Sequence, residues 1–129
     1  MDAVTHPDEA TASDVMEHFV PVRLSTADHS GRAREMEVRW LPGQVVAQSS
    51  GRVEHRWVGF LGPDRYRVEL LFGRAVHAMS TKAYDQADAL FGRLLAEHPG
   101  SARTEEGCYW WGVSAMRQHR NPAPAIEKW

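Results

Sequence analysis

The chain has a single cysteine, Cys108, among its 129 residues. One cysteine cannot form a disulfide within the chain, so the sequence does not favour an oxidising compartment. No apolar run approaches the roughly 18 residues of a membrane-spanning helix. The N-terminal sequence Met-Asp-Ala-Val-Thr-His also lacks the basic and apolar regions of a signal peptide. We therefore expect a cytoplasmic protein that does not engage a membrane.

An excess of charge of either sign is also lacking. The formal net charge is -2 and the isoelectric point is near 6.4, so the chain has no general attraction to phosphate backbones. Nucleic acid is therefore not expected as a partner. A composition of 43% apolar and 25% charged residues is that of a globular chain, either one ordinary domain or two small units.

Motifs for metal, phosphate and acid–base chemistry are missing as well. The seven histidines show no HxxH, HxH or HExxH spacing, which favours scattered surface or core side chains over a metal site. The glycines match neither a G-x-G-x-x-G pattern nor a P-loop. Neighbouring carboxylates such as Glu105 and Glu106 fall on an amphipathic helix, where a solvated face is the simpler interpretation. We expect no cofactor, no metal and no catalytic residue.

The stretch from Val38 to Phe60 predicts a β-hairpin with a proline at its entrance. Two runs rich in β-favouring residues, Gly43–Ala47 and Val53–Phe60, are separated by the turn-forming sequence Ser-Ser-Gly. Strands joined by so short a loop must be antiparallel neighbours. Pro42 removes a ladder donor before the first strand and biases the preceding residue towards extended geometry. Whether the bond before Pro42 is cis stays open at this point.

Helical periodicity predicts helices on both sides of the hairpin. The sequence His-Pro-Asp-Glu is a helix-start signal for a helix over Asp8–His18, and Phe19–Ser25 then predicts a short strand. Further helices are expected at Arg32–Glu37, Pro63–Thr81, Tyr84–Glu97 and Thr104–Gln118, with the first turns of another at Ala125–Trp129.

The hairpin and its surroundings resemble the thioredoxin family. In that family a cis-proline loop leads into an antiparallel hairpin, a glycine follows on the second strand, and a last helix packs across the sheet. The corresponding residues here are Val38, Trp40, Pro42, Val45, Val46, Gly51, Val53, Gly59 and Phe60. The resemblance runs from Asp2 to Phe72 and implies a partial thioredoxin-like domain over residues 1–72. It also implies that Trp40, Leu41 and Pro42 form a peptide-binding loop; alternatively, the proline only shapes the strand entrance.

One departure from the family concerns its Cys-x-x-Cys pair, which is absent here. The family's central strand and the helix with this pair precede the residues that Met1 and Asp2 resemble. The resemblance therefore implies a vacancy between Phe19–Ser25 and Gly43–Ala47, with unpaired backbone groups along both edges. The coding region could begin upstream of Met1, the two strands could pair directly, or another chain could fill the gap. The last case implies a homo-oligomer through the exposed sheet edge.

The helices after the hairpin resemble tetratricopeptide repeats, which are helix-turn-helix units of about 34 residues. The signature positions are occupied by Leu71, Ala75, Ala78, Tyr84, Ala87, Phe91, Leu94 and Pro99, and a second unit begins with Cys108, Trp111, Gly112 and Ala115. Lys82 stands where the turn often has glycine. The resemblance implies a helical region over residues 63–129 that shares the helix 63–81 with the preceding part. Candidate interface residues are Trp110, Trp111 and Trp129, although Trp111 falls at a packing position of the repeat.

Together these features predict a mixed α/β fold, with a partial thioredoxin-like sheet followed by a tetratricopeptide-like helical hairpin. The expected function is that of a redox-inactive interaction module that binds a protein or peptide partner. The alternative is a fragment of a thiol-disulfide oxidoreductase whose Cys-x-x-Cys lies upstream of Met1, and only that longer chain would be an enzyme. Cys108 is interpreted as a small buried residue rather than a reactive thiol.

We expect the isolated chain to show no thiol-disulfide reductase activity. A single cysteine cannot pass from a mixed disulfide to a resolving thiol, so the two-thiol cycle cannot be completed. Insulin reduction in the presence of dithiothreitol measures this activity. Turnover above background that persists in the Cys108→Ser variant would show that the missing motif is not decisive.

Overall fold

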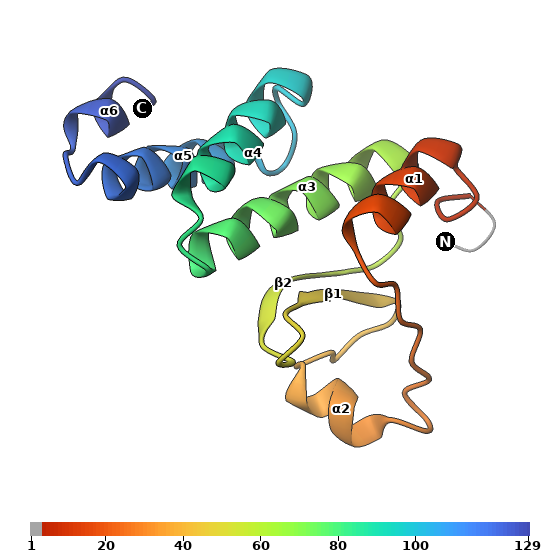
Figure 1. Cartoon of the computed structure of the whole chain (residues 1–129). Helices are drawn as coiled ribbons and strands as arrows, with labels where there is room; N and C mark the ends of the chain where they lie inside the picture. Colours follow the sequence, from red (N-terminus) through yellow and green to blue (C-terminus); the bar gives the residue numbers. More distant parts are fainter. Residues whose placement is uncertain (1–3) are drawn as a thin grey trace. The chain divides into compact units, whose positions relative to one another are not determined.

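The computed structural model describes residues 4–129, and Asp2, where the thioredoxin resemblance is expected to begin, lies outside them. The chain is mixed α/β and mostly helical, with one small two-stranded antiparallel sheet in the described part (Figure 1). The elements are α1 (Glu9–His18), α2 (Ser30–Glu35), β1 (Gly43–Ala47), β2 (Val53–Val58), α3 (Pro63–Ser80), α4 (Tyr84–Glu97), α5 (Thr104–His119) and α6 (Ala123–Ile126). The predicted mixed α/β class is thereby confirmed.

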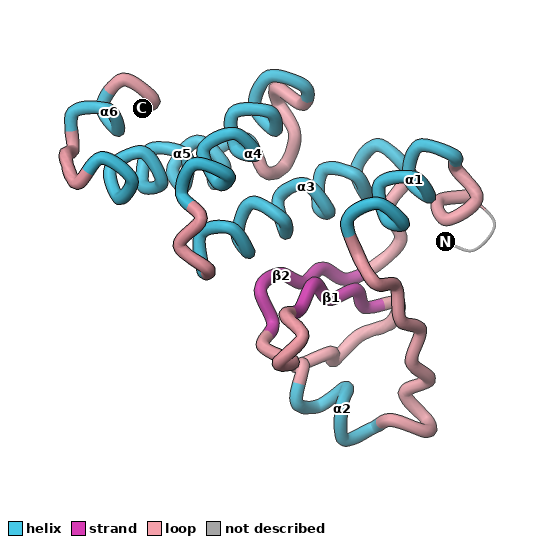
Figure 2. The backbone as a smooth tube through the Cα atoms, viewed as in Figure 1, coloured by secondary structure: helices cyan, strands magenta, loops and turns pink. Residues whose placement is uncertain are grey.

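The chain divides into two compact units, Met1–Arg67 and Val68–Trp129. The first unit holds α1, α2 and the sheet, and the second holds α4, α5 and α6 (Figure 2). The boundary falls inside α3, so the first turn of this helix belongs to one unit and the remainder to the other. The expected domain ranges 1–72 and 63–129 stay a prediction.

Helix α1 begins at Glu9, one residue after the predicted start, because Asp8 caps it. The Asp8 carboxylate accepts hydrogen bonds from the Thr11 hydroxyl at 2.7 Å and from the Thr11 backbone N–H at 2.8 Å. These bonds satisfy a donor that has no partner within the helix. The hydrogen bonds from Thr11, first from its side chain and then from its backbone, hold the pKa of Asp8 below its usual value.

The predicted strand at Phe19–Ser25 is wrong. This segment lies outside all helices and strands, and within residues 4–129 the only strand pairing is that of β1 with β2. Its apolar residues Val20, Val22 and Leu24 are 89%, 73% and 45% exposed. A strand requires a neighbour for its backbone groups, and no neighbour receives this segment. Direct pairing of Phe19–Ser25 with Gly43–Ala47, one of the expected ways to close the gap, is therefore wrong as well.

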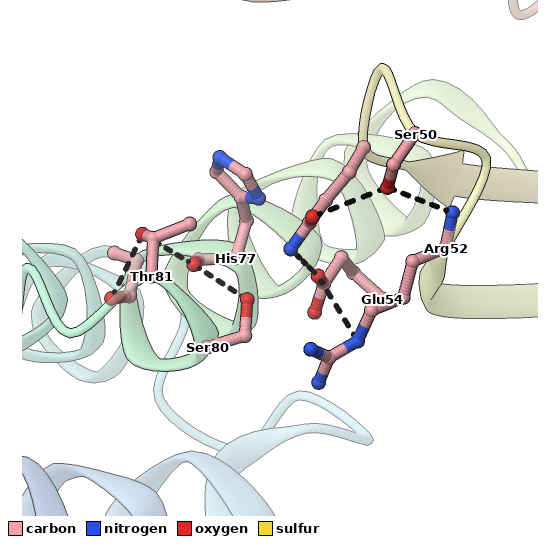
Figure 3. A network of polar contacts seen from close by, with 8 residues as sticks. Ser50, Arg52, Glu54, His77, Ser80 and Thr81 are labelled. Carbon is pink, nitrogen blue, oxygen red and sulfur yellow. Dashed lines mark hydrogen bonds and ion pairs between the residues drawn. The ribbon is translucent and has the colours of Figure 1, made fainter.

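The predicted hairpin is confirmed. Strands β1 and β2 pair antiparallel from Gly43 opposite Val58 to Ala47 opposite Val53, with an irregularity after Val46. At the turn Gly51 has φ +89°, and its N–H donates to the Gln48 carbonyl at 2.9 Å. Side chains reinforce the turn (Figure 3), since the hydroxyl of Ser50 lies 3.4 Å from the backbone nitrogen of Arg52, which donates to it, and Gln48 hydrogen-bonds Glu54.

One face of β2 carries aromatic side chains that pack with Tyr66. Trp57 is buried, and its ring meets that of Tyr66, from the first turn of α3, edge-on at a centroid distance of 5.4 Å. His55, two residues earlier and therefore on the same face, lies 5.4 Å from the Trp57 ring. Burial in this cluster raises the pKa of Tyr66. The aromatic side chains on this face of β2 thus form the core of the first unit together with Tyr66.

Helix α3 ends in a tight turn without glycine. Lys82 has φ +63°, and the Ala83 N–H donates to the Ala78 carbonyl at 2.9 Å. This is the left-handed geometry that commonly closes a helix and that glycine adopts most easily. The Thr81 hydroxyl donates to the His77 carbonyl at 2.9 Å, as does that of the neighbouring Ser80 (Figure 3). These bonds satisfy carbonyls of the last turn.

The core of the second unit lies between α3 and α4. The buried cluster consists of Val68, Leu71, Phe72, Ala75, Ala78, Ala87, Phe91 and Leu94. The rings of Phe72 and Phe91 meet edge-on at a centroid distance of 6.0 Å, while three alanines allow the helices to approach. Of the repeat-signature positions in α4, Phe91 and Ala87 are fully buried, whereas Tyr84 is only partly buried.

We expect Phe91→Ala to lower the free energy of unfolding by about 3 to 5 kcal/mol, the usual range for a fully buried aromatic side chain. Phe60, which is 56% exposed, provides the matched control. Phe60→Ala should change the free energy of unfolding by less than about 1 kcal/mol. Urea denaturation followed by circular dichroism measures both, and equal losses would contradict the assigned core.

Candidate functional site

The proline loop keeps two large apolar side chains in solvent. Trp40 is 73% exposed and Leu41 is 66% exposed, and the Leu41–Pro42 peptide bond is cis. The carbonyl of Pro42 accepts a hydrogen bond from the Gly59 N–H at 2.8 Å, so the ladder between the strands continues one step beyond β1. Pro42 therefore shapes the strand entrance, while the residues before it remain available for contact.

Gly43 fixes the loop because no side chain fits at this position. A Cβ atom on Gly43 would lie 2.6 Å from Cγ1 of Val38 and 3.1 Å from the carbonyl oxygen of Trp40. Both distances are shorter than van der Waals contact, and the second involves backbone, which cannot swing aside. The chain from Val38 to Gly43 consequently folds closely on itself, and Trp40 and Leu41 project from a constrained backbone.

An arginine of β2 holds the end of α2. The Arg56 guanidinium lies 2.6 Å from the Glu37 carboxylate and donates a hydrogen bond to the Met36 carbonyl at 3.2 Å. Glu37 itself adopts φ +54°, and the Val38 N–H donates to the Ala33 carbonyl at 2.8 Å. A cation at the carbonyl end of a helix is favourable, and it also joins α2 to the hairpin.

An open pocket of about 390 Å³ lies beside the proline loop. It is lined by Thr26, Ser30, Ala33, Arg34, Glu37, Val38, Arg39 and Leu41. Leu41 therefore belongs both to the proline loop and to the pocket wall. Within residues 4–129 no ion pair engages Arg34 or Arg39, whereas Glu37 is held by Arg56. The pocket thus combines apolar surface with two arginines that make no ion pair in the described part of the chain.

Sequence reasoning missed Arg34 and Arg39. The only signal was the density of arginine shortly before the proline loop, in the sequence Gly-Arg-Ala-Arg-Glu-Met-Glu-Val-Arg-Trp. Such a run is usually a solvated face. Arg34 and Arg39 can be recognised as pocket-lining residues only once the end of α2 is fixed against β2, and that is a tertiary contact.

The three candidate interface tryptophans have different surroundings. Trp110 and Trp111 are partly buried and pack against the α3–α4 core, whereas Trp129 is 62% exposed. The Trp110 ring meets Tyr109 edge-on at 5.2 Å, and the Trp129 ring stacks on Tyr109 with centroids 6.2 Å apart. Trp129 is thus the most accessible of the three.

Cys108 is half-buried, and its Sγ donates to the Lys128 carbonyl at 3.2 Å. Across residues 4–129, no three His, Cys, Asp or Glu side chains are grouped so that they could hold a metal ion. In the same part of the chain, every helix falls short of the length or apolar character that crossing a bilayer requires.

We expect Gly43→Ala to destabilise the hairpin by about 1 to 3 kcal/mol, the usual effect of overpacking a constrained site. Gly31 is the matched control, because a Cβ there would meet nothing within 4 Å. Gly31→Ala should be neutral or slightly stabilising, since alanine favours a helix more than glycine does. Thermal unfolding of both variants measures the difference, and equal midpoints would contradict the tight loop.

No protein-family model matches the chain, and no curated protein or solved structure matches it. The thioredoxin-like and tetratricopeptide-like resemblances therefore stay predictions from the sequence.

Proposed function

We propose that the chain is a redox-inactive interaction module whose first unit binds an extended peptide at the proline loop. The observation that carries this proposal is the exposure of Trp40 and Leu41, at 73% and 66%, on a loop whose backbone is closely constrained. Tryptophan is the residue most enriched among those that dominate binding energy. Because the loop is already ordered, little conformational entropy is lost when a partner binds.

The order of elements supports a thioredoxin-like first unit. A proline loop precedes β1, the antiparallel β2 follows, and α3 begins after a short connection. In thioredoxin-like proteins the corresponding loop contacts the backbone of a bound peptide. The proposal gives Trp40, Leu41 and Pro42 that role here. It assigns no redox chemistry, because the Cys-x-x-Cys pair is absent from the sequence.

The order and packing of the helices in the second unit support a tetratricopeptide-like interpretation of that unit. Helices α3 and α4 are joined by a three-residue turn, Thr81 to Ala83, and pack through small residues and a pair of phenylalanines. When helix pairs of this kind are stacked as repeats, they create concave surfaces that bind partners. The proposed module would therefore offer one interaction surface in each unit.

The lining of the pocket suggests the chemistry of the peptide. Ala33, Val38 and Leu41 offer apolar surface, and Arg34 and Arg39 offer guanidinium groups beside it. Guanidinium groups bind carboxylates with two parallel hydrogen bonds, which gives direction as well as attraction. We therefore propose a peptide in which an acidic residue stands next to an apolar or aromatic one.

Selection of randomised peptides on the immobilised full chain tests this function. We expect the enriched peptides to pair Asp or Glu with an apolar neighbour, and Trp40→Ala to weaken their binding about tenfold or more. Met16→Ala is the matched control, because Met16 is 71% exposed on α1, outside the proline loop. This substitution should leave the peptide affinity unchanged. Isothermal titration calorimetry measures the affinities.

The paired variant Arg34→Gln, Arg39→Gln tests the charge contribution in the same experiment. It should weaken binding of the selected peptides and flatten the dependence of affinity on salt, because exposed charges are screened by ions. Enrichment of basic peptides, or affinities that do not respond to Trp40→Ala, would contradict the proposed site.

A further inference from the structure

The segment after α5 turns back and packs on the helix that it follows. Arg120 ends α5 with φ +52°, in left-handed geometry, and α6 then returns alongside α5 (Figure 1). Ala125 of α6 is fully buried, whereas Ile126 is 69% exposed. The contact therefore does not depend on large apolar side chains of α6. Its most specific interactions are made by the next residues, Lys128 and Trp129.

Lys128 sits between an aromatic face and a carboxylate. Its Nζ lies 3.7 Å from the centroid of the Trp111 ring and 3.1 Å from Oδ1 of Asp88. That oxygen is buried and makes no hydrogen bond of good geometry within the described chain, so the contact is an ion pair at short range. A cation over the face of tryptophan is attracted by the ring's negative face. Helices α4 and α5 together form a cage for an ammonium group.

Trp129 occupies a slot over a glycine of α5. A Cβ atom on Gly112 would overlap the Trp129 indole, so only glycine leaves room for the ring. The indole Nε1 donates to the Tyr109 carbonyl at 3.3 Å, and the Tyr109 and Trp129 rings stack at an interplanar angle of 9°. Cys108 completes the contact by donating to the Lys128 carbonyl at 3.2 Å. One face of α5 therefore contacts both the backbone carbonyl of Lys128 and the ring of Trp129.

We propose that this surface is a recognition site for a lysine followed by an aromatic residue, and that the chain's own residues 121–129 occupy it as a tethered ligand. The partner is a peptide that carries the same Lys-aromatic pair and displaces the segment. Both side chains stay partly solvent-accessible, with Lys128 21% and Trp129 62% exposed. A partly exposed ion pair and a stacked ring contribute less to folding than fully buried contacts do, yet they are directional enough to select a sequence. This inference does not rest on the proline loop.

Tethering sets how strongly the segment competes with a free peptide. A short linker gives its ligand an effective concentration roughly in the millimolar range. A free peptide with micromolar intrinsic affinity would then bind the intact chain far more weakly than a chain in which the tethered segment is disabled. Disabling Lys128 and Trp129 should therefore increase the affinity for the free peptide, the opposite of what the loss of a structural contact would do.

Fluorescence anisotropy with the labelled peptide Asn-Pro-Ala-Pro-Ala-Ile-Glu-Lys-Trp tests the proposal on full-length chains. The paired variant Lys128→Ala, Trp129→Ala is expected to bind this peptide at least about tenfold more tightly than the unaltered chain does. A control peptide with alanine in place of both its lysine and its tryptophan should not bind. Adding Asp88→Asn, which keeps the shape of the side chain, should reverse most of the gain in affinity.

Circular dichroism shows whether the paired variant keeps its helices. If it does not, Lys128→Ala alone replaces it, with a smaller gain in affinity expected. A folded variant that binds the peptide no better than the unaltered chain overturns the proposal and leaves these contacts as packing. Sedimentation of the unaltered chain tests whether a second copy of the chain occupies the surface instead. A monomer supports a partner peptide, whereas a dimer lost in the variant would make a second copy the occupant and overturn the proposal.

Discussion

The first unit depends on the contact between Trp57 and Tyr66. A two-stranded hairpin is at best marginally stable alone, so β1 and β2 need an apolar surface to pack on. The buried Trp57 ring meets Tyr66 at 5.4 Å and joins the sheet to the first turn of α3. Because side chains alternate along a strand, this contact turns Arg56 to the opposite face, where it holds the end of α2. The candidate pocket thus follows from the burial of one tryptophan.

The second unit combines a buried pair of phenylalanines with a close approach of helix backbones. Ala75, Ala78 and Ala87 are fully or almost fully buried between α3 and α4. Between α4 and α5, a Cβ on Gly107 would lie 2.9 Å from Leu94, which shows how near the two helices come. Close packing of this kind positions α5 so that its other face, with Gly112, is left for the segment that follows.

Elements with strong local signals were predictable, and those defined by distant partners were not. The predicted helix Tyr84–Glu97 and the hairpin strand Gly43–Ala47 are reproduced residue for residue, because periodicity, proline and turn residues all favour them. Phe19–Ser25 has strand-forming residues, but a strand exists only where a neighbour receives its hydrogen bonds. The proline loop was likewise predictable, whereas the roles proposed for Arg34 and Asp88 depend on contacts between elements that no local pattern contains.

The near-neutral charge of the chain conceals two candidate sites of opposite sign. The formal net charge is only -2, which by itself indicates no charged partner. Locally, however, Arg34 and Arg39 line the pocket of the first unit, while Asp88 and the face of Trp111 receive a cation in the second. Electrostatic complementarity acts over about a Debye length, so the local groups and not the total charge determine which peptide is attracted. The two surfaces would therefore select different partners, an acidic peptide for the pocket and a lysine-containing one for α4 and α5.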